Sequence, residues 1–250
     1  MQAFTSVLFN LLSNPEYIEP LRHDVETAVA EEGWTKAGMD KMRKVDSFLR
    51  ESQRLNGPGI CSLDYPSWTT ITDVLLLFPV SLTRLAIRPF TFSNGVTVPA
   101  GTLIATPSTA VHRDGEIYPN PKNFDGFRFT QLRERNGVPV AGQQATSTSA
   151  QYLTFGYGRL AWCVFYFVFA STHRSYLYSC ISPGRFFAAS EIKALLAHIL
   201  VTYDIKFEEG KQAPRTIVVN SMRLPRKANV MFRKRQKWNM IKGRIFQYSS

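Results

Sequence analysis

The sequence predicts a single α+β domain that is mainly α-helical and carries small antiparallel sheets. Two stretches, at residues 14–30 and 41–55, repeat apolar side chains at the spacing of a helix. Asn94-Gly95 separates two short runs of β-branched and aromatic residues, which is typical of a hairpin turn. The 250 residues are 44% hydrophobic and 20% charged, an ordinary globular composition that allows one sizeable core.

The start of the chain is expected to form two helices. Residues 4–12 are strongly apolar, as in a buried helix. Asn14 and Pro15 then begin the second helix, with Asn14 as the N-cap and Pro15 at the first helical position, where its missing N–H is harmless. Gly33 ends this helix.

The next helix is predicted over residues 41–55 and carries Glu51 and Arg54 three positions apart. Residues i and i+3 share a helix face, so the carboxylate and the guanidinium can pair. Taken alone, such a pair is more typical of a solvated surface, where it stabilises by only about 0.3–0.5 kcal/mol. The apolar face of this helix is expected to consist of Met42, Val45, Phe48, Leu49 and Leu55.

Later segments add strands and one more long helix. Residues 90–98 form the predicted hairpin, and the polar stretch at residues 131–149 is typical of a surface loop. Residues 186–200 repeat apolar positions as a core-facing helix does. Residues 202–207 and 216–219 are expected to pair with each other as the closing strands.

The formal net charge of +11 allows two interpretations. It can serve an anionic partner, or it can be a basic surface with no special partner. Apart from the run at residues 226–237, the positive residues are spread out, whereas a nucleic-acid footprint is clustered, so we expect no nucleic-acid partner. The three cysteines, Cys61, Cys163 and Cys180, have no spacing that indicates disulfides or a zinc site.

Four motifs follow one another along the chain. They are ESQR at residues 51–54, HRD at residues 112–114, FDGFRF at residues 124–129, and FGYGRLA at residues 155–161, whose apparent continuation PGRFFAA starts at residue 183. Joined through one Cys, the last two segments would read FGYGRLA-C-PGRFFAA. In this order the motifs resemble E-x-x-R, H-R-D, F-x-x-x-R-F and the haem-binding loop F-x-x-G-x-R-x-C-x-G of the cytochrome P-450 family.

The resemblance implies that residues 1–250 are a single partial domain, the C-terminal part of a haem-thiolate monooxygenase of the fungal microsomal type. Such enzymes insert one oxygen atom of O2 into a small organic substrate. Haem is the implied cofactor, and its iron is held by a Cys thiolate. An NADPH-dependent reductase would supply electrons at the cytoplasmic face of the endoplasmic-reticulum membrane. The membrane anchor and the oxygen-binding helix of the full-length relative would precede residue 1.

For individual residues, the resemblance implies a structural triad and a set of haem contacts. Glu51, Arg54 and Arg128 would form the buried triad, in which one carboxylate accepts hydrogen bonds from two guanidiniums. The residues expected to contact haem are Phe155, Gly156, Gly158, Arg159, Arg84 and His112. Two of these stay open: Arg159 can equally be a solvated surface residue, and His112 can equally be structural. No catalytic residue is assigned.

The position of the iron ligand is where the chain departs from the family. Trp162 stands where the family has Cys, and Cys163, the candidate metal ligand, stands one residue late. Two segments, at residues 60–80 and 162–182, intrude on the family pattern, and all three cysteines lie within them.

These two segments are interpreted as translated introns, the alternative being genuine loop insertions. The TGG codon of Trp162, followed by the T of the Cys163 codon, contains a GT intron start. An AGC or AGT codon for Ser182 would supply the AG end. Excision would then join TG to C or T, which restores a Cys codon directly before Pro183 and keeps the reading frame.

Two hypotheses for function follow. In the first, the chain derives from a haem-dependent monooxygenase but is inactive as written, because its haem loop is interrupted. In the second, it is a haem-free basic remnant with a binding role or with no role.

Overall fold

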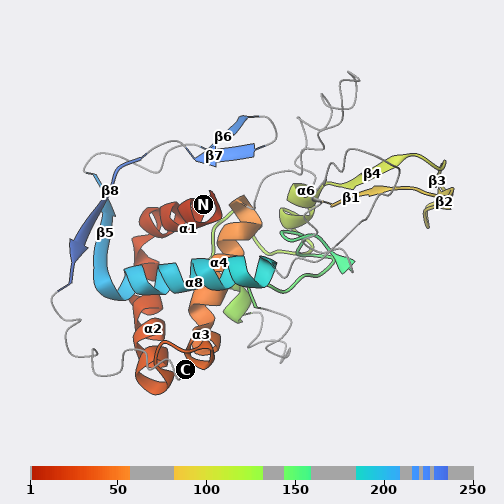
Figure 1. The fold of residues 1–250 in the computed structure, drawn as a ribbon. Helices are drawn as coiled ribbons and strands as arrows, with labels where there is room; N and C mark the ends of the chain where they lie inside the picture. The colour runs from red at the N-terminus through yellow and green to blue at the C-terminus, as the bar shows by residue number, and fades with distance from the viewer. Residues whose placement is uncertain are drawn as a thin grey trace, which may run out of the picture.

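The computed structural model describes residues 2–56, 82–131, 144–158, 184–208, 216–219, 222–225 and 228–235. In these residues, long helices pack side by side, and four two-stranded antiparallel sheets lie around them (Figure 1). The predicted class, a mainly helical α+β domain with small antiparallel sheets, is confirmed.

The predicted stretches form helices, with two corrections, and the structure adds two short helices, at residues 36–41 and 108–112. The described helices are α1 (Gln2–Ser13), the 3-10 turn η1 (Pro15–Tyr17), α2 (Ile18–Glu32), α3 (Lys36–Lys41), α4 (Arg43–Asn56), α6 (Ser108–His112) and α8 (Gly184–Thr202). Asn14 does not cap a helix through its side chain, because its amide donates instead to the Asn10 carbonyl oxygen, 2.8 Å away. The stretch predicted as one helix over residues 41–55 is divided at Met42, whose ψ of 74° leaves the helical region.

The hairpin at Asn94-Gly95 is confirmed, and Gly95 has the positive φ, 85°, that its turn requires. The antiparallel pairs are β1 (Leu82–Leu85) with β4 (Leu103–Thr106), β2 (Phe90–Thr91) with β3 (Thr97–Val98), β5 (Tyr203–Phe207) with β8 (Val230–Lys234), and β6 (Thr216–Val219) with β7 (Met222–Pro225).

The predicted pairing of residues 202–207 with residues 216–219 is therefore wrong. Strand β6 pairs with its immediate successor β7, and closing so short a connection costs little entropy. Strand β5 pairs with β8 instead, and Arg233 of β8 reaches Asp204 of β5 with an N–O distance of 3.2 Å.

The apolar core lies between α1, α2, α4 and α8. In α4, Val45, Phe48 and Leu49 follow the i, i+3, i+4 spacing and are fully buried. The other helices contribute buried side chains at similar spacing, among them Val7, Leu11, Leu21, Val25, Leu196 and Leu200. None of the helices among the described residues is long and apolar enough to cross a membrane.

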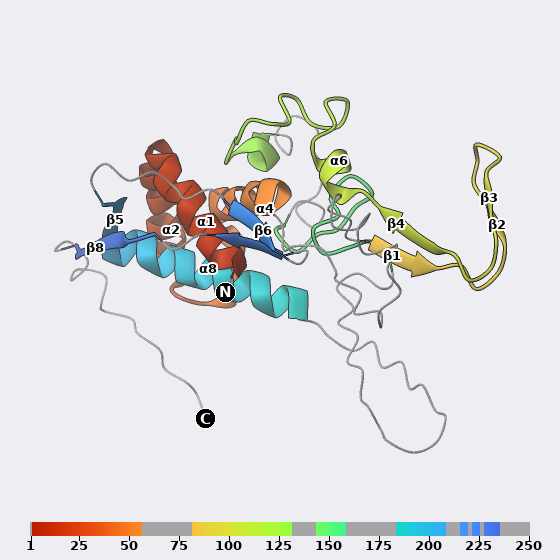
Figure 2. The same cartoon turned by 90° about the horizontal axis from the view of Figure 1, so that it is seen from above.

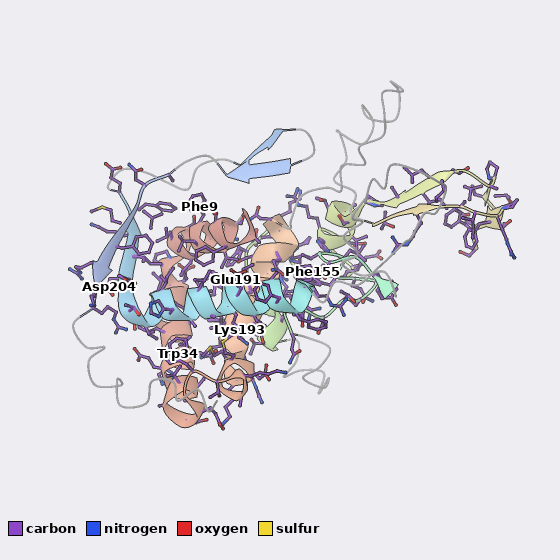
Figure 3. All side chains as sticks on the ribbon, viewed as in Figure 1. Phe9, Trp34, Phe155, Glu191, Lys193 and Asp204 are labelled. Carbon is purple, nitrogen blue, oxygen red and sulfur yellow. The ribbon has the colours of Figure 1, made fainter. Side chains whose placement is uncertain are left out.

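An ion pair joins α8 to α4, and a hydrogen bond joins α8 to α2. Lys193, in the middle of α8, lies with its Nζ 2.9 Å from Oδ2 of Asp46 on α4, and both side chains are largely buried. At the C-terminal end of α8, Arg22 of α2 donates through Nε to the Leu200 carbonyl oxygen, 2.8 Å away, and pairs with Asp204 of β5. Figure 3 labels Lys193 and Asp204 at these two places. Burial raises the pKa of Asp46 despite the neighbouring lysine.

The β1–β4 ribbon extends away from the helices and carries the β2–β3 hairpin at its far end (Figures 1 and 2). In both views, α6 and the loop of residues 144–158 lie near the base of this ribbon. Sheet β5–β8 lies at the opposite end of the molecule. The end of α6, where the HRD motif starts, and the FGYG stretch at residues 155–158 therefore lie where the helical body meets the ribbon.

Candidate functional site

Glu51 and Arg54 form a buried, two-pronged ion pair on α4. Arg54 donates through Nε to Glu51 Oε2 and through Nη2 to Oε1, with both distances 2.8 Å. The two side chains are fully buried. Two parallel bonds of this kind are the geometry in which a guanidinium binds a carboxylate most strongly. The surface pair that the four-residue motif alone would allow is therefore not what the structure contains.

Arg128 joins this pair from the loop between α6 and residue 131. Its Nε lies 3.2 Å from Glu51 Oε1, and the Asp125 backbone N–H donates to the same oxygen over 3.1 Å. The rest of the Arg128 guanidinium donates to backbone carbonyls of the loop, including that of Asn123 at 3.1 Å. The structure thus brings Glu51, Arg54 and Arg128 into one buried triad that fixes this loop against α4.

Two tyrosine hydroxyls hold the loop of residues 149–156 in place, one from residue 118 and one from the loop itself. The Tyr118 hydroxyl donates to the Gln151 carbonyl oxygen, 2.8 Å away. The Tyr152 hydroxyl donates to the Arg50 carbonyl oxygen on α4, 3.2 Å away. Burial raises the pKa of both tyrosines above the ordinary value, so both hydroxyls keep their protons as donors.

Arg50 places a buried charge against two neighbouring aromatic rings. Its guanidinium carbon lies 4.3 Å from the ring centre of Tyr152 and 4.5 Å from that of Phe129. Its Nη1 donates to the Gln144 carbonyl oxygen over 3.2 Å. A guanidinium over ring faces is stabilised by cation–π attraction, although burial lowers the pKa of Arg50.

The glycine-rich loop starts directly after Tyr152 and its contacts with α4. The Gly156 N–H donates to the Leu153 carbonyl oxygen over 2.9 Å and closes a turn that contains the buried Phe155. Gly156 and Gly158 have φ values of 76° and 77°, which side chains with a Cβ rarely adopt. A Cβ at Gly158 would meet no atom within 4 Å, so the loop is open on that side among the described residues.

The predicted site residues fall into three groups. Phe155, Gly156 and Gly158 lie in one turn, and their contact with haem stays a prediction. Arg84 lies exposed on β1. Arg159, Trp162 and Cys163 lie outside the described residues, as do the segments 60–80 and 162–182.

His112 is buried, and both of its ring nitrogens lie at hydrogen-bond distance from backbone groups of Arg54 and Leu153. This arrangement favours the structural role that the sequence left open. Sequence reasoning missed Arg50 and Tyr152. The only local signal for Arg50 is its place beside Glu51 on the helix, and Tyr152 has none beyond its nearness to the glycine loop.

The described residues fit the approach to a haem, and the ligand position of the signature lies outside them. The turn with two left-handed glycines gives a backbone that a flat ring could approach closely. Among the described residues, no group of three His, Cys, Asp or Glu is arranged to hold a metal ion. At the ligand position of the signature, the sequence has Trp162, and an indole offers only an N–H donor. No thiolate ligand is therefore assigned.

Comparison with known proteins supports the same family. The profile of the cytochrome P-450 family matches residues 75–163. The chain is 38% identical to cytochrome P-450 monooxygenase 151 of Postia placenta over 234 residues, which are 93% of this chain and 39% of that protein. It is 36% identical to cytochrome P-450 monooxygenase janQ of Penicillium janthinellum, over 94% of this chain and 39% of that protein.

Over most of its length, the chain is similar to monooxygenases of the cytochrome P-450 family. It spans about two-fifths of the length of the curated relatives it matches, 39% in both of these cases. The family profile ends at residue 163, within the segment that interrupts the haem-loop signature.

Proposed function

We propose that this chain is part of a haem-dependent monooxygenase that inserts one oxygen atom of O2 into a small organic substrate. An NADPH-dependent reductase would supply the electrons, at the cytoplasmic face of the endoplasmic-reticulum membrane. The observation that carries the proposal is the buried Glu51–Arg54–Arg128 triad, which holds the loop at residues 119–128 against α4.

The described residues would contribute structure around the cofactor. The two glycines would let the flat ring approach the backbone of the turn closely, beside the buried Phe155, and Arg84 would offer a guanidinium to a haem carboxylate. Haem, when bound, would supply the oxygen chemistry. The triad has no role in moving protons, because an arginine does not release its proton in proteins. Its part is to keep the loop in place.

We further propose that the chain as written does not hold haem iron through a native-like thiolate. The iron-ligand position is Trp162, Cys163 stands one residue late, and Pro183-Gly184, which should follow the ligand, is displaced. Functional sites hold their geometry to within about half an ångström, and a one-residue shift in a loop is much larger. The haem-free remnant is the second candidate, and the same residues favour it.

The interruption itself is proposed to be a retained intron. Sequenced transcripts should include a form in which a single Cys codon replaces the codons for Trp162 to Ser182, encoding FGYGRLACPGRFF. Deep sequencing that finds only the longer form, or a TCN codon for Ser182, would contradict this.

Absorbance spectra of the reduced, CO-treated protein test the haem proposal. The gene's reading frame is expressed in two forms, one as written and one with Cys in place of residues 162–182. Only the second form should show the Soret band of a thiolate-ligated haem. The same band from the first form would refute the loss of ligation, and haem binding by neither form would favour the remnant.

A further inference from the structure

His112 connects the buried triad to the glycine turn through contacts that belong to no sequence motif. Its side chain is 5% exposed. The Leu153 backbone N–H donates to its Nε2 over 2.8 Å, and its Nδ1 lies 3.2 Å from the Arg54 carbonyl oxygen. One imidazole therefore spans the space between the end of α4 and the loop that leads to FGYG.

These partners determine which ring nitrogen carries the proton. Because the Leu153 N–H is a donor, Nε2 must offer a lone pair, and the neutral ring then carries its hydrogen on Nδ1. That hydrogen points to an acceptor, the Arg54 carbonyl oxygen. Arg54 also donates through Nη1 to the His112 carbonyl oxygen, so the two residues are joined in both directions.

Leu153 connects the imidazole of His112 to the glycine turn through its two backbone hydrogen bonds. Its N–H is directed to His112, while its carbonyl oxygen accepts the Gly156 N–H over 2.9 Å. The neighbouring Tyr152 ring stacks on the imidazole, with 5.5 Å between ring centres and 27° between planes. A displacement of the imidazole would therefore move the first residue of the turn.

We propose that His112 is a positioning residue, which sets the course of the FGYG loop in its neutral, Nδ1-protonated form and acts through Leu153. The proposal deepens the proposed function and rests on it, in that the loop is taken as a haem loop. It assigns His112 to the protein scaffold, because both ring nitrogens are engaged by backbone groups, in place of a contact with a haem carboxylate.

Two substitutions in the 250-residue chain separate positioning from general stability. His112→Asn can still donate to the Arg54 carbonyl oxygen but is too short to reach Leu153. His112→Gln can place its amide oxygen near the former Nε2 and accept the Leu153 N–H. Backbone amide hydrogen exchange is measured at Leu153 and Gly156, and in α2 and α8 as a reference.

His112→Asn should speed exchange at Leu153 and Gly156 by about ten-fold or more, while α2 and α8 stay unchanged, since the opening is local. His112→Gln should restore most of the protection. Unchanged exchange at Leu153 in His112→Asn, or equal acceleration everywhere in both variants, would overturn the proposal.

A measurement on the unsubstituted chain decides the case even if His112→Asn does not fold. Imidazole ¹⁵N chemical shifts at neutral pH should show a protonated Nδ1 and an unprotonated Nε2 for His112. The opposite tautomer, or a doubly protonated ring, would overturn the proposal. Neither readout needs haem or activity, so a failure of the haem spectra leaves this result unaffected, and the reverse also holds.

Discussion

The two halves of α4 bury largely different kinds of side chain. Its first half packs Val45, Phe48 and Leu49 into the apolar core. Its second half, residues 50–54, buries two arginines, a glutamate, a serine and a glutamine, none of them more than 4% exposed. One continuous helix thus passes from a hydrophobic core into a polar one within two turns.

The difference lies in what each half requires of its neighbours. Apolar packing is non-directional, so the first half needs partners of about the right volume. The second half needs donors and acceptors at fixed positions, because a buried charge without its partner is costly. Glu51 accepts from Arg54, Arg128 and the Asp125 backbone, which ties α4 to a loop more than 70 positions later. The polar half therefore specifies where distant loops lie.

The largest effect should come from Glu51→Ala, which leaves Arg54 and Arg128 buried without a carboxylate. Removing one partner of such a group typically costs about 3–5 kcal/mol of unfolding free energy. Urea denaturation of the chain and of the variant measures this cost. Glu51→Gln is the matched control, because it keeps one acceptor and the shape but loses the charge, and it should fall between the two. A Glu51→Ala variant as stable as the parent would show that the triad contributes nothing to the fold.

A smaller effect is expected from a conservative exchange in each half of α4. Arg54→Lys loses the two parallel bonds to Glu51 and the bond to the Pro121 carbonyl oxygen, and should cost about 1.5–3 kcal/mol. Leu49→Met, five residues away and also fully buried, conserves volume and should cost less than about 1.5 kcal/mol. Thermal and urea denaturation of both variants measure the two losses of stability. Equal losses would contradict the expected difference between the polar and the apolar half of α4.

The sequence predicted local features better than contacts between distant segments. Helical spacing located α2 and α8, and the Asn94-Gly95 pair located its hairpin, because each signal lies within a few neighbouring residues. The contact between Arg128 and Glu51 was predicted from the order of the motifs, through the family resemblance. The pairing of β5 with β8 depends on the path of long connections, and no periodicity encodes that path.

The contact of His112 with Leu153 could not be predicted for the same reason. It joins residues 41 positions apart, and each residue looks ordinary in its own motif. Tyr152 and Arg50 form a cation–π contact between residues 102 positions apart. Such polar contacts need a definite loop conformation, which the residue types alone do not specify.

The smallest effect is expected at the first turn of α4, where the helix begins. Asp24 of α2 accepts the backbone N–H groups of Lys44 and Val45 at 3.0 and 3.3 Å, and so caps α4 from another helix. Burial nevertheless raises the pKa of Asp24 above its ordinary 3.8. Asp24→Asn keeps an acceptor oxygen, so at neutral pH it should change stability by less than about 1 kcal/mol.

The pH dependence of this variant gives the sign of the charge effect. A raised pKa means that the folded state binds the Asp24 proton more tightly than the unfolded state does. The resulting stabilisation is fully present below the ordinary pKa and is lost as the pH rises through the folded value. Because Asn does not titrate, the parent's stability relative to Asp24→Asn should fall as the pH rises from about 3.5 to about 7. Urea unfolding of both proteins at several pH values measures this difference. A difference that grows in the parent's favour with pH would mean that the carboxylate charge stabilises the cap, and that hydrogen bonding there outweighs burial.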